Sequence, residues 1–256
     1  MHSPTLFALA KALQPNAKHW PPPCRSLDQP SLSDLKDLRH QFQRDGSSLA
    51  HEDHGAGPRG WQGARRSAPP GATRHRTVSA VAKSAITPEK EAEAIVRMLR
   101  TLSPHGRLLE LGTSLGIMSA HLLRSGWNVE TWEGCPNTLT KAQEGWEALG
   151  VSHQIVSRQG RFDRLLASCQ ADAMWDVVYL DGHHEGQATL DLLDALEPRV
   201  RVGVIVDDIA WTLDMHKAWE MAKNKPGWRV AISWAGRGIL LKGEHMSSQH
   251  VRLGVL

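Results

Sequence analysis

The chain has 256 residues, enough for one α/β domain with an extension. Its 30 lysines and arginines against 27 acids give a net charge of +3, which does not by itself indicate a nucleic-acid partner. No apolar run approaches the ~20 residues that span a bilayer. The three cysteines are too far apart for a metal knuckle or a disulfide framework. We therefore expect a protein of a reducing, cytoplasmic compartment with no membrane partner.

Residues 1–76 predict an N-terminal extension that is partly helical, with a basic linker rich in glycine and proline. Apolar residues recur at helical spacing from Leu32 to Phe42, between two proline clusters that interrupt any continuous helix. No acid occurs between Asp53 and Glu89, whereas arginine is frequent there. Two interpretations of this stretch stay open: a solvated linker, or a loop that folds over an active site and contacts an anionic substrate.

After residue 76 the pattern becomes regular. Thr87 and Pro88 predict a helix start, because Thr is a good cap and Pro suits the first helical position. Short strands then alternate with helices. The predicted strands are Arg107–Leu111, Val129–Trp132, Gln154–Ser157, Asp176–Leu180 and Val202–Val206. The predicted helices are Met118–Arg124, Leu139–Leu149, Phe162–Ser168, Ala188–Leu196 and Leu213–Lys223.

The end of the chain predicts two further strands, Trp228–Trp234 and Arg237–Lys242. Only Ala235 and Gly236 separate them, which is too short for a crossover helix, so the two strands should be antiparallel. The alternating series before them predicts a parallel sheet covered on both faces. We therefore predict an α/β domain over residues 77–256. Its fold class is Rossmann-like and doubly wound, with a mainly parallel seven-stranded sheet and a C-terminal antiparallel strand pair.

The turn after the first of these strands predicts a cofactor site, because ligands of open parallel sheets lie outside the carboxyl ends of the strands. The strand carries Glu110, Gly112 can form the tight turn, and Gly116 would let a ligand approach the next helix. A dinucleotide fingerprint would need glycines at the positions of Ser114 and Ile117. The acid-x-G-x-x-x-G pattern instead matches loops that bind S-adenosylmethionine (SAM).

Two later strand ends extend this prediction. Glu133 follows the second strand, where an acid can accept both ribose hydroxyls; the alternative is a solvated charge at a strand end. After the third strand, Phe162 could pack on adenine and Asp163 could accept from its amine. Equally, Phe162 could belong to the core and Asp163 could cap the next helix. The expected cofactor residues are Glu110, Gly112, Thr113, Ser114, Gly116, Glu133, Gly134, Phe162, Asp163 and Asp181.

A second acidic cluster is expected where Asp181 ends the fourth strand and Asp207 and Asp208 end the fifth. These strands should be neighbours, and oxygen-only ligands suit Mg²⁺. Alternatively, Asp208 caps the next helix, Asp207 bonds backbone N–H groups and Asp181 serves only the cofactor. His183 and His184 follow Asp181, and a histidine there could act as general base or merely shape the loop.

Four segments carry a resemblance to a known family: Leu109–Ile117, Glu133–Pro136, Tyr179–His184 and Val206–Trp211. They resemble a bacterial group of small, O-methyltransferase-like SAM-dependent enzymes called methyltransferase family 24. The resemblance implies the class I methyltransferase fold, SAM as cofactor and methyl transfer, without naming a substrate. It also favours the second histidine, so Asp181 and His184 are the candidate catalytic residues. Catechol-type O-methyltransferases are similar in holding Mg²⁺ with acids at these places.

The leading hypothesis is therefore O-methylation of a small-molecule hydroxyl, with Mg²⁺ assistance as an added hypothesis through Asp181, Asp207 and Asp208. One alternative is an RNA methyltransferase that uses the basic stretch from Arg59 to Lys83 on phosphates. Another is a catalytically silent SAM-binding protein. A small-molecule substrate is favoured over a nucleic acid, and a homodimer is compatible with each hypothesis.

Overall fold

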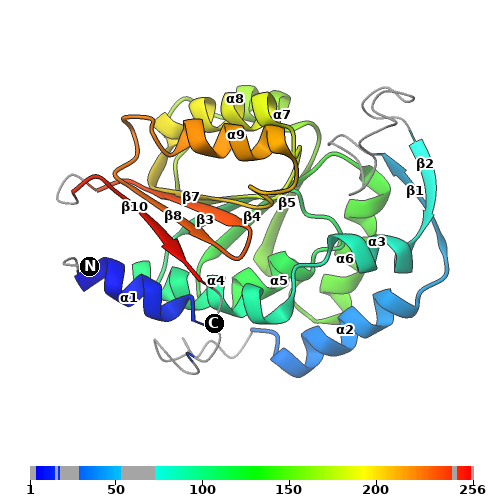
Figure 1. The fold of residues 1–256 in the computed structure, drawn as a ribbon. Coiled ribbons are helices and arrows are strands. Elements are labelled where there is room, and N and C mark those ends of the chain that lie inside the picture. Colours follow the sequence, from blue (N-terminus) through cyan, green and yellow to red (C-terminus); the bar gives the residue numbers. More distant parts are fainter. Residues whose placement is uncertain (1–3, 15–16, 18–28, 53–72, 244–246, 255–256) are drawn as a thin grey trace.

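Eight strands form a central sheet between two layers of helices in the computed structural model, which describes residues 4–14, 17, 29–52, 73–243 and 247–254 (Figure 1). The strands are β3 (Arg107–Leu111), β4 (Asn128–Glu133), β5 (Ile155–Gln159), β6 (Trp175–Leu180), β7 (Val200–Val206), β8 (Val230–Trp234), β9 (Arg237–Leu241) and β10 (Gln249–Leu253). Their order across the sheet is β10-β8-β9-β7-β6-β3-β4-β5. The strands β3 to β7 are mutually parallel, and β9 is antiparallel to both β7 and β8.

The predicted parallel sheet with an antiparallel end is confirmed, but the predicted number of seven strands is wrong. An eighth strand, β10, runs parallel to β8 at the edge, with Gln249 opposite Val230. Its five residues are only half-buried or exposed, and only Val251 and Leu253 pack against the core. An edge strand of this kind gives a weak signal because only one side of it pairs.

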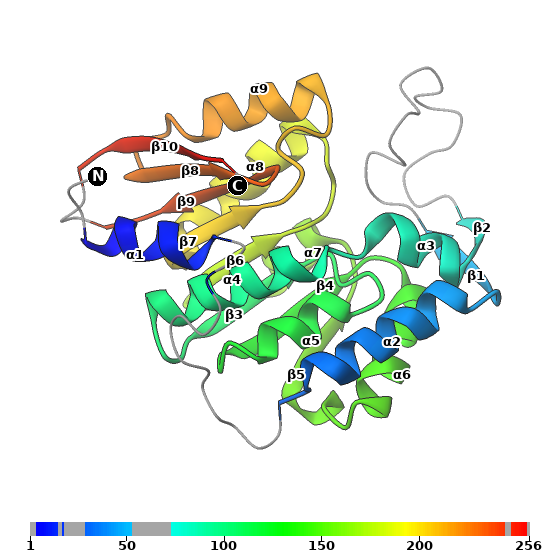
Figure 2. The same cartoon turned by 60° about the horizontal axis from the view of Figure 1, so that its bottom comes forward.

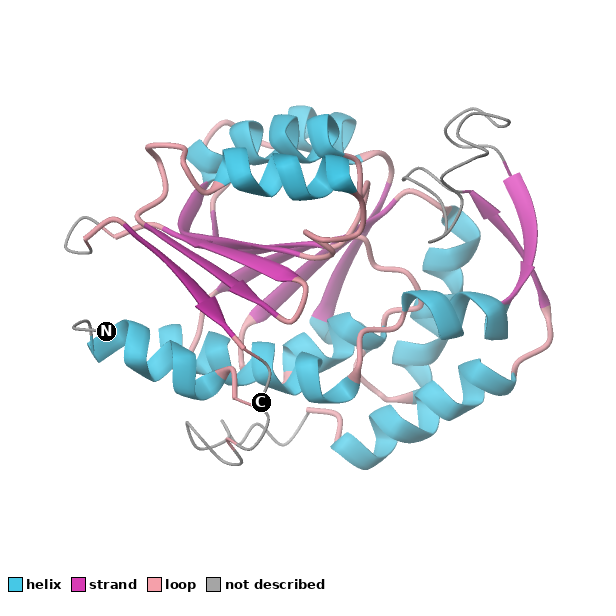
Figure 3. Cartoon of the chain, viewed as in Figure 1, coloured by secondary structure: helices cyan, strands magenta, loops and turns pink. Residues whose placement is uncertain are grey.

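Both faces of the sheet are covered, as Figure 3 shows. One layer holds α7 (Phe162–Ser168), α8 (Gly186–Leu196) and α9 (Leu213–Ala222), and the other holds α1 (Pro4–Ala12), α4 (Glu89–Leu102), α5 (Ile117–Leu123) and α6 (Pro136–Ala148). Consecutive strand residues such as Leu108 and Leu109, or Val177 and Val178, enter opposite apolar clusters. Successive side chains point to opposite faces of the sheet, so each parallel strand is buried on both faces. Within the described ranges, no helix has the length and apolar character needed to cross a bilayer.

The N-terminal part adds four elements beside this domain: α2 (Leu32–Arg44), β1 (Ser48–Glu52), β2 (Thr73–Thr77) and α3 (Val78–Ala85). The predicted helix is α2, which Ser31 and Asp34 begin with a capping box. It packs against α3 and α5, and the antiparallel pair of β1 and β2 lies beside α6 (Figure 2). The expected basic linker falls mainly on residues 53–72, outside the described residues.

The helix expected at Thr87 begins later than predicted. Its first residue is Glu89, and Pro88 is the N-cap, without a side-chain cap bond. The carbonyl of Thr87 instead accepts a hydrogen bond from the Arg39 side chain. This bond holds the linker between α3 and α4 against α2, and that linker borders the site described next.

Candidate functional site

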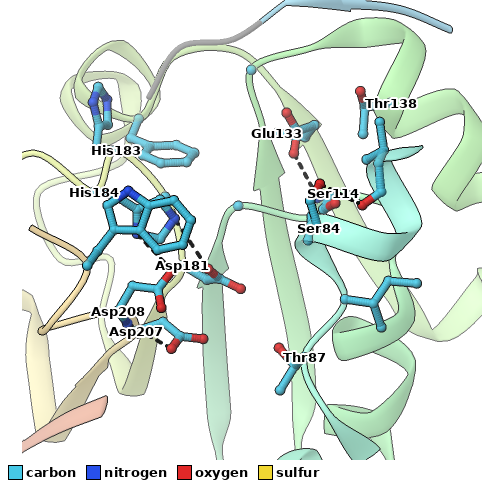
Figure 4. Close-up of a pocket in the computed structure, with 18 of the residues that line it drawn as sticks. Ser84, Thr87, Ser114, Glu133, Thr138, Asp181, His183, His184, Asp207 and Asp208 are labelled. Atoms are coloured by element: carbon cyan, nitrogen blue, oxygen red, sulfur yellow. Dashed lines mark hydrogen bonds and ion pairs between the residues drawn. The ribbon is translucent and has the colours of Figure 1, made fainter. Parts of the chain in front are cut away.

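A cavity of about 1030 Å³ opens at the carboxyl ends of the parallel strands (Figure 4). Ligand sites of proteins commonly have about 300–1,000 Å³, so a cofactor and a second small molecule fit together. The strand ends contribute Gly112, Ser114, Glu133, Asp181, Asp207 and Asp208. Further wall residues come from Ser84–Pro88, which covers the end of α3 and the linker to α4, and from the strands β1 and β2. The N-terminal part therefore completes the cavity.

The turn after β3 is held in place by a close backbone contact. Gly112 has a φ of +107°, and a Cβ built on it would lie 2.0 Å from the backbone oxygen of Asp181. Ser114 follows with a φ of +50°, a left-handed conformation that glycine adopts more easily. Only a residue without a Cβ therefore allows β3 and β6 to approach at the point where both reach the cavity.

Gly116 has a different role from the one expected. A Cβ on it would lie 2.5 Å from Nε1 of Trp146, and this indole N–H donates a 2.8 Å hydrogen bond to the Gly116 carbonyl. Gly116 does not line the cavity. Its missing side chain thus admits Trp146 of α6 rather than a ligand.

Glu110 supports the turn from behind and does not line the cavity. Its carboxyl group is completely buried and accepts hydrogen bonds from the hydroxyls of Ser119 and Thr131, the latter at 2.6 Å. Burial raises the pKa of Glu110 to about 7, the two hydrogen bonds oppose this shift, and the charge of Glu133 adds to it. Thr113 is likewise buried, 2.6 Å from the hydroxyl of Thr131, and lies outside the cavity lining.

Replacing Glu110 by glutamine is expected to change how stability depends on pH. The folded-state pKa of about 7 lies above the ordinary 4.5, so below pH 4.5 the carboxyl is protonated in both states and costs nothing. Between pH 4.5 and pH 7 the unfolded state ionises while the folded state stays protonated, so the free energy of unfolding falls by about 3 kcal/mol over this range and no further above it. Urea unfolding of both proteins at pH 5 and pH 8 measures this. Glu110→Gln should lose less stability than the native chain, and parallel losses would contradict the burial of an ionisable group here.

Glu133 reaches the cavity from the end of β4 (Figure 4). Its carboxylate accepts hydrogen bonds from the backbone N–H groups of Ser114 and Cys135, both at 2.9 Å. It is therefore a fixed group that ties the first turn to the second, and not merely a solvated charge at a strand end. A charged acceptor held in this way beside a cavity is suited to binding hydroxyl donors.

Phe162 lies both in the core and at the cavity, whereas Asp163 points elsewhere. Phe162 belongs to the apolar cluster beneath α7 and also lines the cavity, with its ring edge-on to His183 at 5.6 Å. Asp163 pairs with Arg161 at 3.1 Å on the exposed surface and does not line the cavity. The expected contact between Asp163 and adenine is thus not what this geometry offers.

Asp207 lies in a network that the sequence analysis missed. Its Oδ2 accepts from the Tyr179 hydroxyl at 2.5 Å and from Nη2 of Arg237 at 3.1 Å, while its Oδ1 accepts from the backbone N–H of Asp208 at 2.8 Å. Arg237 is buried and also pairs with Glu91. The sequence signal for this network was Arg237 itself, an arginine at the start of the buried strand β9. Its partners could not be predicted, because Asp207 follows β7 and Glu91 lies in α4.

His184 lies between the two remaining carboxylates. Its Nε2 is 3.7 Å from Oδ1 of Asp181, and its Nδ1 is 3.8 Å from Oδ2 of Asp208. The indole of Trp211 lies beside the imidazole at 5.7 Å between ring centroids. Burial raises the pKa of Asp181 well above its usual range, and the charges of Asp207 and Asp208 raise it further. Figure 4 shows these side chains along one wall of the cavity.

The three aspartates come together, but they do not fit the expected Mg²⁺ site. Oδ2 of Asp207 already accepts from Tyr179 and from the cation Arg237, and the ring of His184 lies between Asp181 and Asp208. Over the described ranges, no group of three or more His, Cys, Asp or Glu side chains has the arrangement of a metal site. Asp208 does not cap the next helix either, because Thr212 caps α9.

Backbone strain is concentrated at this cavity. Among the described residues, five other than glycine have a positive φ, and all five line it: Ser114, His183, His184, Asp208 and Ala235. Left-handed conformations of such residues cost free energy and persist where the surrounding structure enforces them. The fold therefore holds these loops in one arrangement around the cavity.

Comparison with known proteins agrees with this geometry. Residues 109–209 match the family model described as a methyltransferase domain. A putative O-methyltransferase from Klebsiella pneumoniae has a similar fold, with a TM-score of 0.54 and 15% identity over 84% of this chain and 92% of that one. The O-methyltransferase from Bacillus cereus in complex with SAH is also similar, with a TM-score of 0.55 and 14% identity over 83% of this chain and 92% of that one.

The O-methyltransferase TomG from Streptomyces achromogenes, in complex with SAM, gives a TM-score of 0.51 and 17% identity over 62% of this chain and 83% of that one. No curated protein matches the chain in sequence. The domain match falls on the strands and turns that build the cavity, from β3 to the end of β7. Residues 109–209 are thus similar to a methyltransferase domain, and the fold is that of these O-methyltransferases.

Proposed function

We propose that this enzyme methylates a hydroxyl group of a small molecule, with His184 as the general base. The observation that carries the proposal is the position of His184, which lines the cavity between two carboxylates. Its Nδ1 is buried and has no hydrogen-bond partner among the described residues. Because Nδ1 is buried and faces Asp208, an acceptor hydroxyl in the cavity would give its proton to Nε2.

Glu133, Phe162 and the Gly112 turn would hold the cofactor. Glu133 offers its carboxylate to the ribose hydroxyls, and Phe162 offers a ring to the adenine. Gly112 and Ser114 line the cavity, and the amino-acid end would lie beside them. When bound, SAM supplies an electrophilic methyl group on a positively charged sulfur.

The chain's own contribution is alignment and proton transfer. Methyl transfer is an in-line displacement, so the acceptor oxygen must be held opposite the leaving sulfur. His184 would take the hydroxyl proton, and the carboxylate of Asp208 would stabilise the imidazolium that results. Trp211 and the linker from Ser84 to Pro88 would enclose the acceptor. The fold likeness to O-methyltransferases supports oxygen as the acceptor atom.

The proposal is tested by transfer of tritiated methyl groups from SAM into fractionated cell extract. Label is expected in a low-molecular-weight fraction, in an ether linkage that survives mild base. Label in RNA or protein would contradict a small-molecule acceptor. Intact SAH binding with no labelled product in any fraction would contradict catalysis and support a silent SAM-binding protein.

Glu133→Ala is expected to weaken binding of SAH by roughly 1–3 kcal/mol, because the ribose loses a charged hydrogen-bond partner. Calorimetric titration of SAH measures the change. Glu147→Ala, at an exposed position on α6, is the matched control and should bind SAH like the native enzyme. Equal affinities of the two variants would show that the ribose lies elsewhere.

A further inference from the structure

The cavity contains a permanent cation of its own. Arg237 opens β9, its side chain is 5% exposed, and it lines the cavity next to the three aspartates. Its Nη2 contacts Asp207 at 3.1 Å, and its Nη1 donates to Glu91 and to the carbonyl of Ala235. An arginine keeps its charge at any physiological pH, and its planar fork suits buried carboxylates.

This arginine offsets part of the negative charge that the aspartates bring together. Neighbouring buried carboxylates repel one another unless a cation or hydrogen bonds offset the charge. Arg237 supplies that cation to Asp207, and the Tyr179 hydroxyl supplies a hydrogen bond. Mg²⁺ needs an octahedral set of free oxygens, whereas Oδ2 of Asp207 already accepts from both Tyr179 and Arg237, and the charge of Arg237 repels a second cation beside it.

A chain of contacts leads from Arg237 to the proposed base. Arg237 holds Oδ2 of Asp207, whose Oδ1 accepts the N–H of Asp208 at 2.8 Å. Asp208 has a φ of +54°, a strained conformation that this hydrogen bond helps to maintain. The carboxylate of Asp208 then lies 3.8 Å from Nδ1 of His184.

We infer that Arg237 takes the place of a divalent ion in this site, and that methyl transfer here requires no metal. Arg237 is a positioning residue: it acts through Asp207 and Asp208 on the orientation of His184. The positioning role rests on the function proposed above. The inference that the three aspartates bind no divalent ion does not rest on that function, because it concerns only what these residues can bind.

The metal statement is tested first, without any methyl acceptor. Mg²⁺ and Mn²⁺ are titrated calorimetrically into the full chain saturated with SAH. No saturable binding below about millimolar concentration is expected, and EDTA should leave any methyl transfer unchanged. Stoichiometric binding that Asp207→Asn abolishes, or activity that EDTA removes and Mg²⁺ restores, would overturn the inference. Absence of methyl transfer altogether counts against the proposed function and leaves the titration as it stands.

The positioning role is tested with Arg237→Gln and Arg237→Lys. For Arg237→Gln we expect kcat to fall roughly 10–100-fold while the dissociation constant of SAH stays within about threefold. Arg237→Lys should recover part of kcat because it restores the charge. Arg201→Gln is the matched control, since Arg201 is half-exposed and pairs with Asp176 away from the cavity.

A native kcat in folded Arg237→Gln would overturn the positioning role. If that variant does not fold, Arg237→Lys carries the test, because its ammonium cannot contact Asp207 and Glu91 with the same planar fork. A reduced kcat with unchanged SAH affinity then supports the role, and a native kcat contradicts it.

Discussion

Replacing His184 by alanine is expected to lower kcat by roughly 10²–10⁴-fold, the usual contribution of general acid–base catalysis. The affinity for SAH should change little, because the cofactor is proposed to be held mainly by Glu133, on the other side of the cavity. The loss follows from removing the group between Asp181 and Asp208 that can take the proton. Initial rates with the acceptor fraction found by methyl labelling, together with SAH calorimetry, measure both quantities.

Rescue with imidazole separates lost chemistry from lost structure. Imidazole added to His184→Ala should restore part of kcat, since the vacated space lies in an open cavity. His216→Gln, at an exposed position on α9, is the matched histidine control and should keep the native rate. An unaltered kcat in His184→Ala would remove this histidine from the mechanism and leave Asp181 as the remaining candidate base.

The parts of the site that the sequence predicts are those set by local pattern. A strand followed by Gly112 and a helix fixes where the first turn lies, and Glu133 and Asp181 follow as the ends of neighbouring strands. Parallel strands bring their carboxyl ends to one edge, so these residues meet whatever the details of packing. This is why the sheet, its antiparallel end and the position of the cavity were predictable.

The parts that the sequence does not predict depend on tertiary partners. Nothing near Gly116 in the chain indicates that Trp146, thirty residues later, needs the space. The pairing of Arg237 with Glu91 spans 146 residues. Asp207 pairs with that distant arginine, so local reasoning could not find the cation that the fold brings to the aspartates.

Gly112→Ala is expected to destabilise the fold by more than about 3 kcal/mol, a large effect for a single methyl group. The added Cβ would lie 2.0 Å from the backbone oxygen of Asp181, and backbone cannot move aside as a flexible side chain can. To relieve this contact β6 must shift, which disturbs the 2.9 Å hydrogen bond from the Asp181 N–H to Leu111. SAH binding should weaken in parallel, since the same shift moves Asp181 away from the cavity.

Gly150→Ala separates this steric effect from the cost of a left-handed backbone. Gly150 also has a positive φ, +70°, but nothing lies within 4 Å of the position that its Cβ would take. Its substitution should therefore cost only the conformational penalty of about 1–2 kcal/mol. Urea unfolding gives the free energy of unfolding of both variants. The difference between the two losses is the steric cost of a Cβ where β3 and β6 approach at Gly112. If the two substitutions cost the same, the strands do not approach as the structure has them, and the turn would have room for a side chain.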